Sequence, residues 1–312
     1  MTVLTIARRQ LGETRWSLLF SAAAFFGLAL LWNWGISEYQ FREETPEESP
    51  PAAPSAEVND GDASPTEEPT DDASRRRRRR GRPGPQVYVA FGVPGDRVLG
   101  LPPDQTPTLL MQVAMANHPL VFLVVLGWGI GRASAAVAGE IERGTLDLTL
   151  SRPVRRSTYM LAQLLAAVVV FGVLGLSIAA GHLVSDQFFR LNEPPSPADY
   201  LPMVASLAAL GLAVFGYTLP ISASDLSRAR AGIIGLGITL AGIAALIFAR
   251  QYEDYEWTAD LSVFQYYAPV GITLEGSSEQ YTDLSILLGI FAAGGLLALL
   301  AFSRRDLPSN SG

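Results

Sequence analysis

The stretch TYMLAQLLAAVVVFGVLGLSIAAGHLV occupies residues 158–184 and contains no Asp, Glu, Lys or Arg. A helix of roughly 20 apolar residues crosses the hydrocarbon core of a bilayer, so this run predicts a membrane-spanning helix. The run is also rich in Gly, Ala and Ser, which let neighbouring membrane helices approach closely. It therefore predicts a helix that packs against other helices inside a membrane.

Five further apolar segments are long enough, or nearly so, to cross the same thickness. They cover residues 16–34, 119–138, 201–222, 229–249 and 284–303. Across the 312 residues, hydrophobic types make up 49% and charged types 17%, whereas a soluble protein carries roughly 25% charged residues. The sequence thus predicts an all-α polytopic membrane protein with six transmembrane helices, and its composition excludes an ordinary soluble enzyme.

The placement of arginines predicts the orientation of these helices. With the N-terminus inside, the cytoplasmic segments hold more arginines than acids, and the outer segments hold more acids than arginines. Both termini are then cytoplasmic, with an amphipathic interface helix at residues 1–15 and a tail at 304–312. The outer side receives a long loop at 35–118 and an amphipathic segment at 250–283.

Residues 41–85 of the first outer loop are rich in Pro, Glu, Asp, Ser and Ala, and we expect them to be disordered. An acidic half meets a basic run at Arg75 to Arg80. The run is interpreted either as part of a spacer whose two halves attract each other or as a docking site for anionic polymers or lipid head groups.

Several kinds of active site are excluded by missing residue types. There is no cysteine, and all 23 basic residues are arginine. A phosphate-binding loop of the type GxxxxGK[ST] requires a lysine, so this chain has no such site for ATP. We expect no catalytic, cofactor or metal site in the chain. The two histidines, His118 and His182, are expected at the outer interface.

The second and third spans are joined by GEIERGTLDLTLSRPVRRS, residues 139–157, which we call the elbow. A charged helical turn is followed by Gly144, an alternating apolar segment and Pro153, which ends any helix. Ser157 is a suitable N-cap for the next span. Such a mixed-charge amphipathic segment offers a compact surface to a soluble partner.

The elbow resembles the E-x-E-x-G-T-L-x-x-L-L-S-R-P-x-x-R signature of type-2 ABC transporter permeases, the membrane subunits of the ABC-2 superfamily. Thr149 departs from it, because a leucine is commoner there. The segments TIARRQLGETRW (5–16), LSVFQYYAPVGI (261–272) and FSRRDLP (302–308) are similar to other parts of these permeases. The residues that match the signature are Glu140, Glu142, Gly144, Thr145, Leu146, Leu150, Ser151, Arg152, Pro153 and Arg156.

The resemblance implies that the elbow is a coupling helix, seated in a groove of a separate ATP-binding subunit that carries ATP and Mg²⁺. Two permeases, identical or different, and two ATPases would form the working unit. The alternative is that the elbow residues merely cap and solvate a helix hairpin. The residues to which the resemblance assigns coupling are Glu140, Glu142, Arg143, Gly144, Thr145, Arg152, Pro153 and Arg156.

Arg132 lies within the second span. A charged side chain there either has a function or extends along the helix to place its charge at the membrane interface.

The sequence predicts a permease subunit of an ABC exporter in contact with membrane lipid and not with nucleic acid. The abundance of arginine over lysine suggests the cytoplasmic membrane of a GC-rich bacterium. The alternative function is a non-transporting scaffold that recruits a cytoplasmic partner for envelope assembly or motility. No residues in the sequence support the hypothesis of an intramembrane enzyme. The sequence does not predict which substrate is transported.

Overall fold

A computed structural model describes residues 2–40, 108–146, 154–191, 193–274 and 276–304, which form helices and connecting turns without a strand. Six helical segments in this part of the chain are long and apolar enough to cross a membrane. They are Val3–Glu38, Pro119–Glu142, Arg156–Ser185, Pro197–Ser224, Arg228–Gln251 and Ser278–Arg304. The predicted all-α fold with six membrane helices is confirmed.

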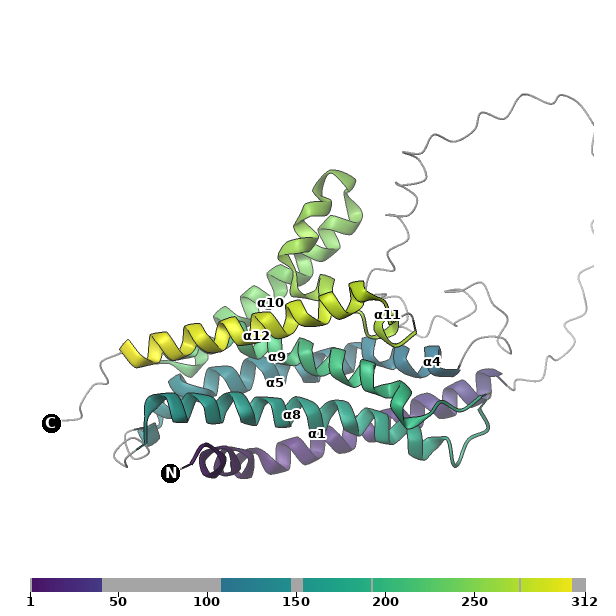
Figure 1. The fold of residues 1–312 in the computed structure, drawn as a ribbon, viewed down its shortest axis with the longest axis horizontal. Helices are drawn as coiled ribbons and strands as arrows, with labels where there is room; N and C mark the ends of the chain where they lie inside the picture. The colour runs from purple at the N-terminus through teal and green to yellow at the C-terminus, as the bar shows by residue number, and fades with distance from the viewer. Residues whose placement is uncertain (1, 41–107, 147–153, 192, 275, 305–312) are drawn as a thin grey trace, which may run out of the picture.

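The long helices form a bundle around α9 (Figure 1). Helix α9 contacts four of the others, and α1 packs along α8. Of the six segments, the one that contains α9 has the largest share of buried residues. The long helices are α1 (Val3–Gln40), α5 (Pro119–Ser134), α8 (Arg156–Ser185), α9 (Leu201–Ser224), α10 (Arg228–Gln251) and α12 (Ser278–Arg304).

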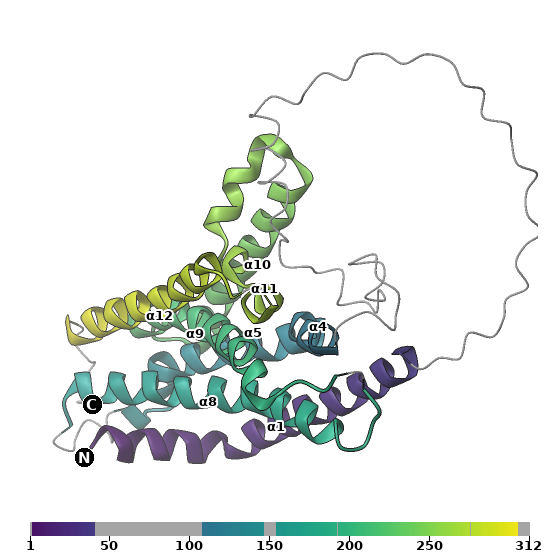
Figure 2. The ribbon, with the colours of Figure 1, turned by 45° about the vertical axis from the view of Figure 1, so that its right-hand side comes forward.

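The start of α1 and the end of α12 lie at one end of the bundle, together with the elbow (Figure 1). We call this the elbow end, and the opposite end, where α4 and α11 lie, the far end. Helix α10 rises away from the other long helices toward a protruding hairpin, as both views show (Figures 1 and 2). The shorter elements are α4 (Thr108–Ala114), η3 (Met115–Asn117), η4 (Ala135–Gly139), α6 (Glu140–Glu142), η5 (Pro197–Tyr200), η6 (Glu253–Leu261), η7 (Val263–Tyr266) and α11 (Pro269–Leu274).

Large apolar side chains cover much of the outer surface of the bundle. Phe20 is 74% exposed, Leu123 70% and Ile233 70%. A water-soluble surface rarely carries so many exposed apolar groups, whereas lipid tails solvate them without cost. The exposed surface therefore supports the membrane location that hydropathy predicts.

Some expected segments belong to longer helices or lie outside the described residues. From Val3 on, the expected interface helix at residues 1–15 is the first part of α1, which continues without a break through the first span. The segments 41–85 and 305–312 lie outside the described residues.

Candidate functional site

The second span ends in a π-helical turn, η4, which follows α5 and leads into the elbow at Gly139. Tyr159 of α8 donates a hydrogen bond of 2.6 Å to the carbonyl of Ala136. The Ser222 hydroxyl of α9 accepts from the backbone N–H of Ala138 at 3.0 Å and donates to the carbonyl of Ser134 at 3.0 Å. Backbone groups that lose regular partners in the π turn are thus bound by two neighbouring helices.

Replacing Tyr159 with phenylalanine should destabilise the protein by about 1–3 kcal/mol, because the buried carbonyl of Ala136 loses its donor. Gln163, which donates to the same hydroxyl at 2.9 Å, also loses its acceptor. Thermal unfolding in detergent measures this loss. The control is Tyr252→Phe, which removes a hydroxyl from an exposed side chain; equal melting temperatures for the two variants would contradict the assignment.

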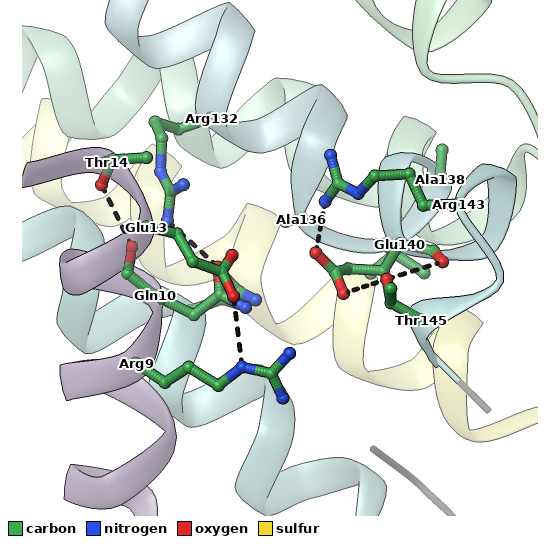
Figure 3. Close-up of polar contacts among 12 residues, drawn as sticks. Arg9, Gln10, Glu13, Thr14, Arg132, Ala136, Ala138, Glu140, Arg143 and Thr145 are labelled. Atoms are coloured by element: carbon green, nitrogen blue, oxygen red, sulfur yellow. Dashed lines mark hydrogen bonds and ion pairs between the residues drawn. The ribbon is translucent and has the colours of Figure 1, made fainter. Parts of the chain in front are cut away.

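Glu140 stabilises the turn after η4 from the inside. Glu140 is only 5% exposed. One carboxylate oxygen accepts from the Arg143 guanidinium, and the other accepts from the Thr145 hydroxyl at 2.6 Å (Figure 3). A buried carboxylate needs such partners, since an unpaired charge is costly to desolvate. Glu140, Arg143 and Thr145 therefore form one hydrogen-bonded group that shapes the elbow.

The chain turns at Gly144, where φ is +68°. Glycine adopts this left-handed conformation without the steric penalty that a Cβ brings. The N–H of Gly144 donates to the carbonyl of Ile141 at 2.9 Å and closes the turn. Gly144 is exposed, and the Arg143 side chain beside it is 49% exposed. The turn at Arg143 and Gly144, which we call the tip of the elbow, thus carries a cationic group that is accessible to a partner.

Two further elbow residues bind the ends of distant helices. The Glu142 carboxylate accepts from the backbone N–H of Arg228 at 3.0 Å, at the first residue of α10. A carboxylate is favourable there because it satisfies an unpaired N–H and faces the positive end of the helix dipole. Arg156 donates to the carbonyl of Phe302 at 2.9 Å, in the last turn of α12. The elbow is therefore connected to both α10 and α12.

The sequence model of the family described as ABC-2 family transporter protein matches residues 53–307. This match covers most of the chain. The protein belongs to the ABC-2 transporter family. No curated protein matches the sequence. As an ABC-2 permease, it is a multi-pass membrane subunit of an ABC transporter, and the family associates with an ATP-binding ABC subunit.

The structure brings together three of the eight residues to which the sequence assigned coupling in this permease. Glu140, Arg143 and Thr145 contact one another, whereas Glu142 and Arg156 contact α10 and α12. Arg152 and Pro153 lie outside the described residues. The role of these residues in coupling to the ATPase stays a prediction.

Sequence reasoning missed Tyr159 and Ser222, the two side chains that bind the π turn. Each is a polar residue within an otherwise apolar span, and that contrast was the available signal. Sequence reasoning also did not predict the surroundings of His182, which it expected at the outer interface. The residue is fully buried between helices, where Asn33 of α1 lies 3.1 Å from its Nδ1 atom.

Arg132 points from α5 toward α1 (Figure 3). Its guanidinium donates to the side-chain carbonyl of Gln10 at 3.4 Å. Arg132 lines a pocket of about 490 Å³, which is also lined by Glu13 of α1 and Arg228 of α10. The predicted intramembrane charge therefore lies in a polar pocket next to the elbow.

Proposed function

We propose that this ABC-2 permease is the membrane subunit of an exporter powered by ATP hydrolysis in a separate subunit. The single observation that carries the proposal is the connection of the elbow to helix ends at Glu142–Arg228 and Arg156–Phe302. Movement of the elbow by a bound ATPase would be transmitted to α10 and α12 through these contacts. The chain itself performs no covalent chemistry.

In this proposal the elbow end faces the cytoplasm of the cell, where ATP is found, and the exposed tip at Arg143 and Gly144 enters the ATPase groove. Glu140 acts indirectly, because its carboxylate is buried and orients Arg143. The membrane itself is the cytoplasmic membrane. ATP and Mg²⁺ bind to the partner and not to this chain.

A second permease copy completes the assembly in this proposal. Helices α5 and α10 border a second pocket at the elbow end, lined mainly by apolar atoms of residues such as Ile130, Ile233 and Leu236. Ile233 is 70% exposed in the single chain. A partner copy packed against this face would cover it and enclose a path between the two chains.

The test is an affinity purification of the detergent-solubilised chain, followed by identification of any ATP-binding subunit that accompanies it. We expect Arg143→Glu to reduce the recovered ATPase by about tenfold, since 1.4 kcal/mol of lost binding has that effect. Arg143→Gln, which keeps a donor for Glu140, should give a smaller loss. The control is Arg190→Glu, at an exposed arginine after α8, and it should recover the ATPase like wild type.

Two results would contradict the proposal in different ways. Full recovery of the ATPase with Arg143→Glu would show that the tip of the elbow is not the docking site. If the folded wild type recovers no ATPase, the transporter function fails and the scaffold alternative replaces it. Size-exclusion chromatography of each variant confirms that the fold is intact.

A further inference from the structure

In the part of the chain that the structure describes, the Arg132 guanidinium forms no ion pair, although Glu13 and Glu140 line the same pocket. Glu13, at the edge of the pocket, is paired with Arg9 at 3.1 Å. Glu140 is paired with Arg143 and Thr145. Both carboxylates of the pocket are therefore already engaged by other groups (Figure 3).

Among the described residues, the Arg132 guanidinium donates one hydrogen bond, to a neutral amide oxygen of Gln10 at 3.4 Å. That distance exceeds the usual range of about 2.7–3.2 Å. A guanidinium has five N–H donors arranged to bind a carboxylate or phosphate through two parallel bonds. Charged groups within a membrane span are costly without such a partner. Arg132 is thus suited to hold an anion.

Arg228 strengthens this preference for an anion, because it lines the same pocket from the start of α10. Its backbone N–H binds Glu142, and its side chain is exposed. Three arginines (Arg132, Arg143 and Arg228) and two carboxylates (Glu13 and Glu140) therefore line the pocket, and both carboxylates already have partners. An anion that enters it meets a net positive surface.

The other part of the pocket is apolar. The pocket extends along α5 away from the elbow end, where it is lined by Leu123, Val124 and Trp128. Val124 and Trp128 lie eight and four residues before Arg132, so a helix places the three on one face. Trp128 is oriented by a 2.9 Å hydrogen bond from its indole N–H to Ser21 of α1. Leu123 is 70% exposed, which leaves this wall open to the apolar surroundings of a membrane protein.

We infer that this pocket binds an anionic amphiphile, with a phosphate or carboxylate at Arg132 and an apolar chain along Leu123, Val124 and Trp128. The inference rests on the proposed transport function, for which it names the substrate class. The same chemistry also occurs in bilayer lipids. Whether the occupant is transported or resident is decided by its effect on the partner ATPase.

The experiment titrates the full chain, purified in detergent with its ATPase, with dioctanoyl phosphatidate as probe and follows binding by calorimetry. We expect Arg132→Gln to weaken phosphatidate binding by about tenfold, as loss of a charge-assisted bidentate contact would do. Arg132→Lys keeps the charge and should retain part of the affinity. The matched control, Arg190→Gln, removes an arginine outside the pocket and should bind like wild type.

Two results would overturn the inference. Equal binding of phosphatidate to wild type and Arg132→Gln would show that the arginine does not hold the anion. Binding of inorganic phosphate as tight as that of phosphatidate would show that the apolar wall contributes nothing. Circular dichroism and size-exclusion chromatography identify any variant that has lost its fold, in which case Arg132→Lys supplies the comparison.

The ATPase rate in the same samples shows whether the bound amphiphile is a transported substrate or a resident bilayer lipid. Stimulation by phosphatidate in wild type, lost in Arg132→Gln, identifies a transported amphiphile. Binding without stimulation identifies a resident lipid with the same anionic chemistry. Failure of the proposed function has a different signature, because no ATPase then accompanies the chain whether or not phosphatidate binds.

Discussion

Replacing Gly294 with alanine should prevent α12 from packing on α9. A Cβ at Gly294 would overlap the backbone carbonyl of Gly216, and a Cβ at Gly216 would lie 2.6 Å from the Cα of Phe291. The obstacle in both cases is backbone, which cannot move aside as a side chain does. Membrane helices associate chiefly through such close packing, since lipid tails solvate apolar side chains as well as a neighbouring helix does. We expect a loss of about 3 kcal/mol or more, at or above the upper end of overpacking effects.

Thermal unfolding in detergent measures this loss, and the same helix offers a matched control. A Cβ at Gly289 meets no atom within 4 Å. Gly289→Ala should therefore leave the melting temperature unchanged or raise it, because alanine favours a helix over glycine by up to about 1 kcal/mol. If Gly294→Ala and Gly289→Ala melt alike, the close contact between α9 and α12 is not formed in the protein.

Replacing Glu142 with alanine should uncouple the permease from its ATPase without releasing the ATPase. The substitution removes the acceptor of the Arg228 N–H and so detaches the elbow from the start of α10. A lost helix cap costs about 0.5–2 kcal/mol, and each 1.36 kcal/mol on a barrier changes a rate tenfold. On the proposed mechanism, we expect the permease-dependent part of the ATPase rate to fall by about tenfold.

The measurement compares the ATPase rate of the reconstituted complex with that of the isolated ATP-binding subunit. Glu142→Gln keeps a carbonyl acceptor and should lose less activity than Glu142→Ala. Glu38→Gln, at an exposed position near the end of α1, is the control and should behave like wild type. A Glu142→Ala complex that retains full stimulation would show that the contact with α10 does not transmit movement. A complex that fails to form would assign Glu142 to docking instead.

Much of the fold could be predicted from the sequence because a membrane span is a local property. Any uninterrupted run of roughly 20 apolar residues is long enough to cross a bilayer, whatever it packs against. The six helical segments therefore correspond to the six apolar runs. The elbow could also be located, since charges at Glu140, Glu142 and Arg143 interrupt the apolar pattern and Gly144 permits the turn that the structure shows.

The sequence by itself determined that this chain is a six-helix membrane protein with a charged elbow after the second span, and only the tertiary structure decided what the polar residues contact. Glu142 binds the N–H of Arg228, 86 residues away, and Tyr159 binds the carbonyl of Ala136 in a different helix. His182 is fully buried and contacts Asn33 of α1. The physical reason is that lipid and neighbouring helices are equally apolar, so hydropathy predicts that a segment enters the membrane but not which of its faces meets a partner.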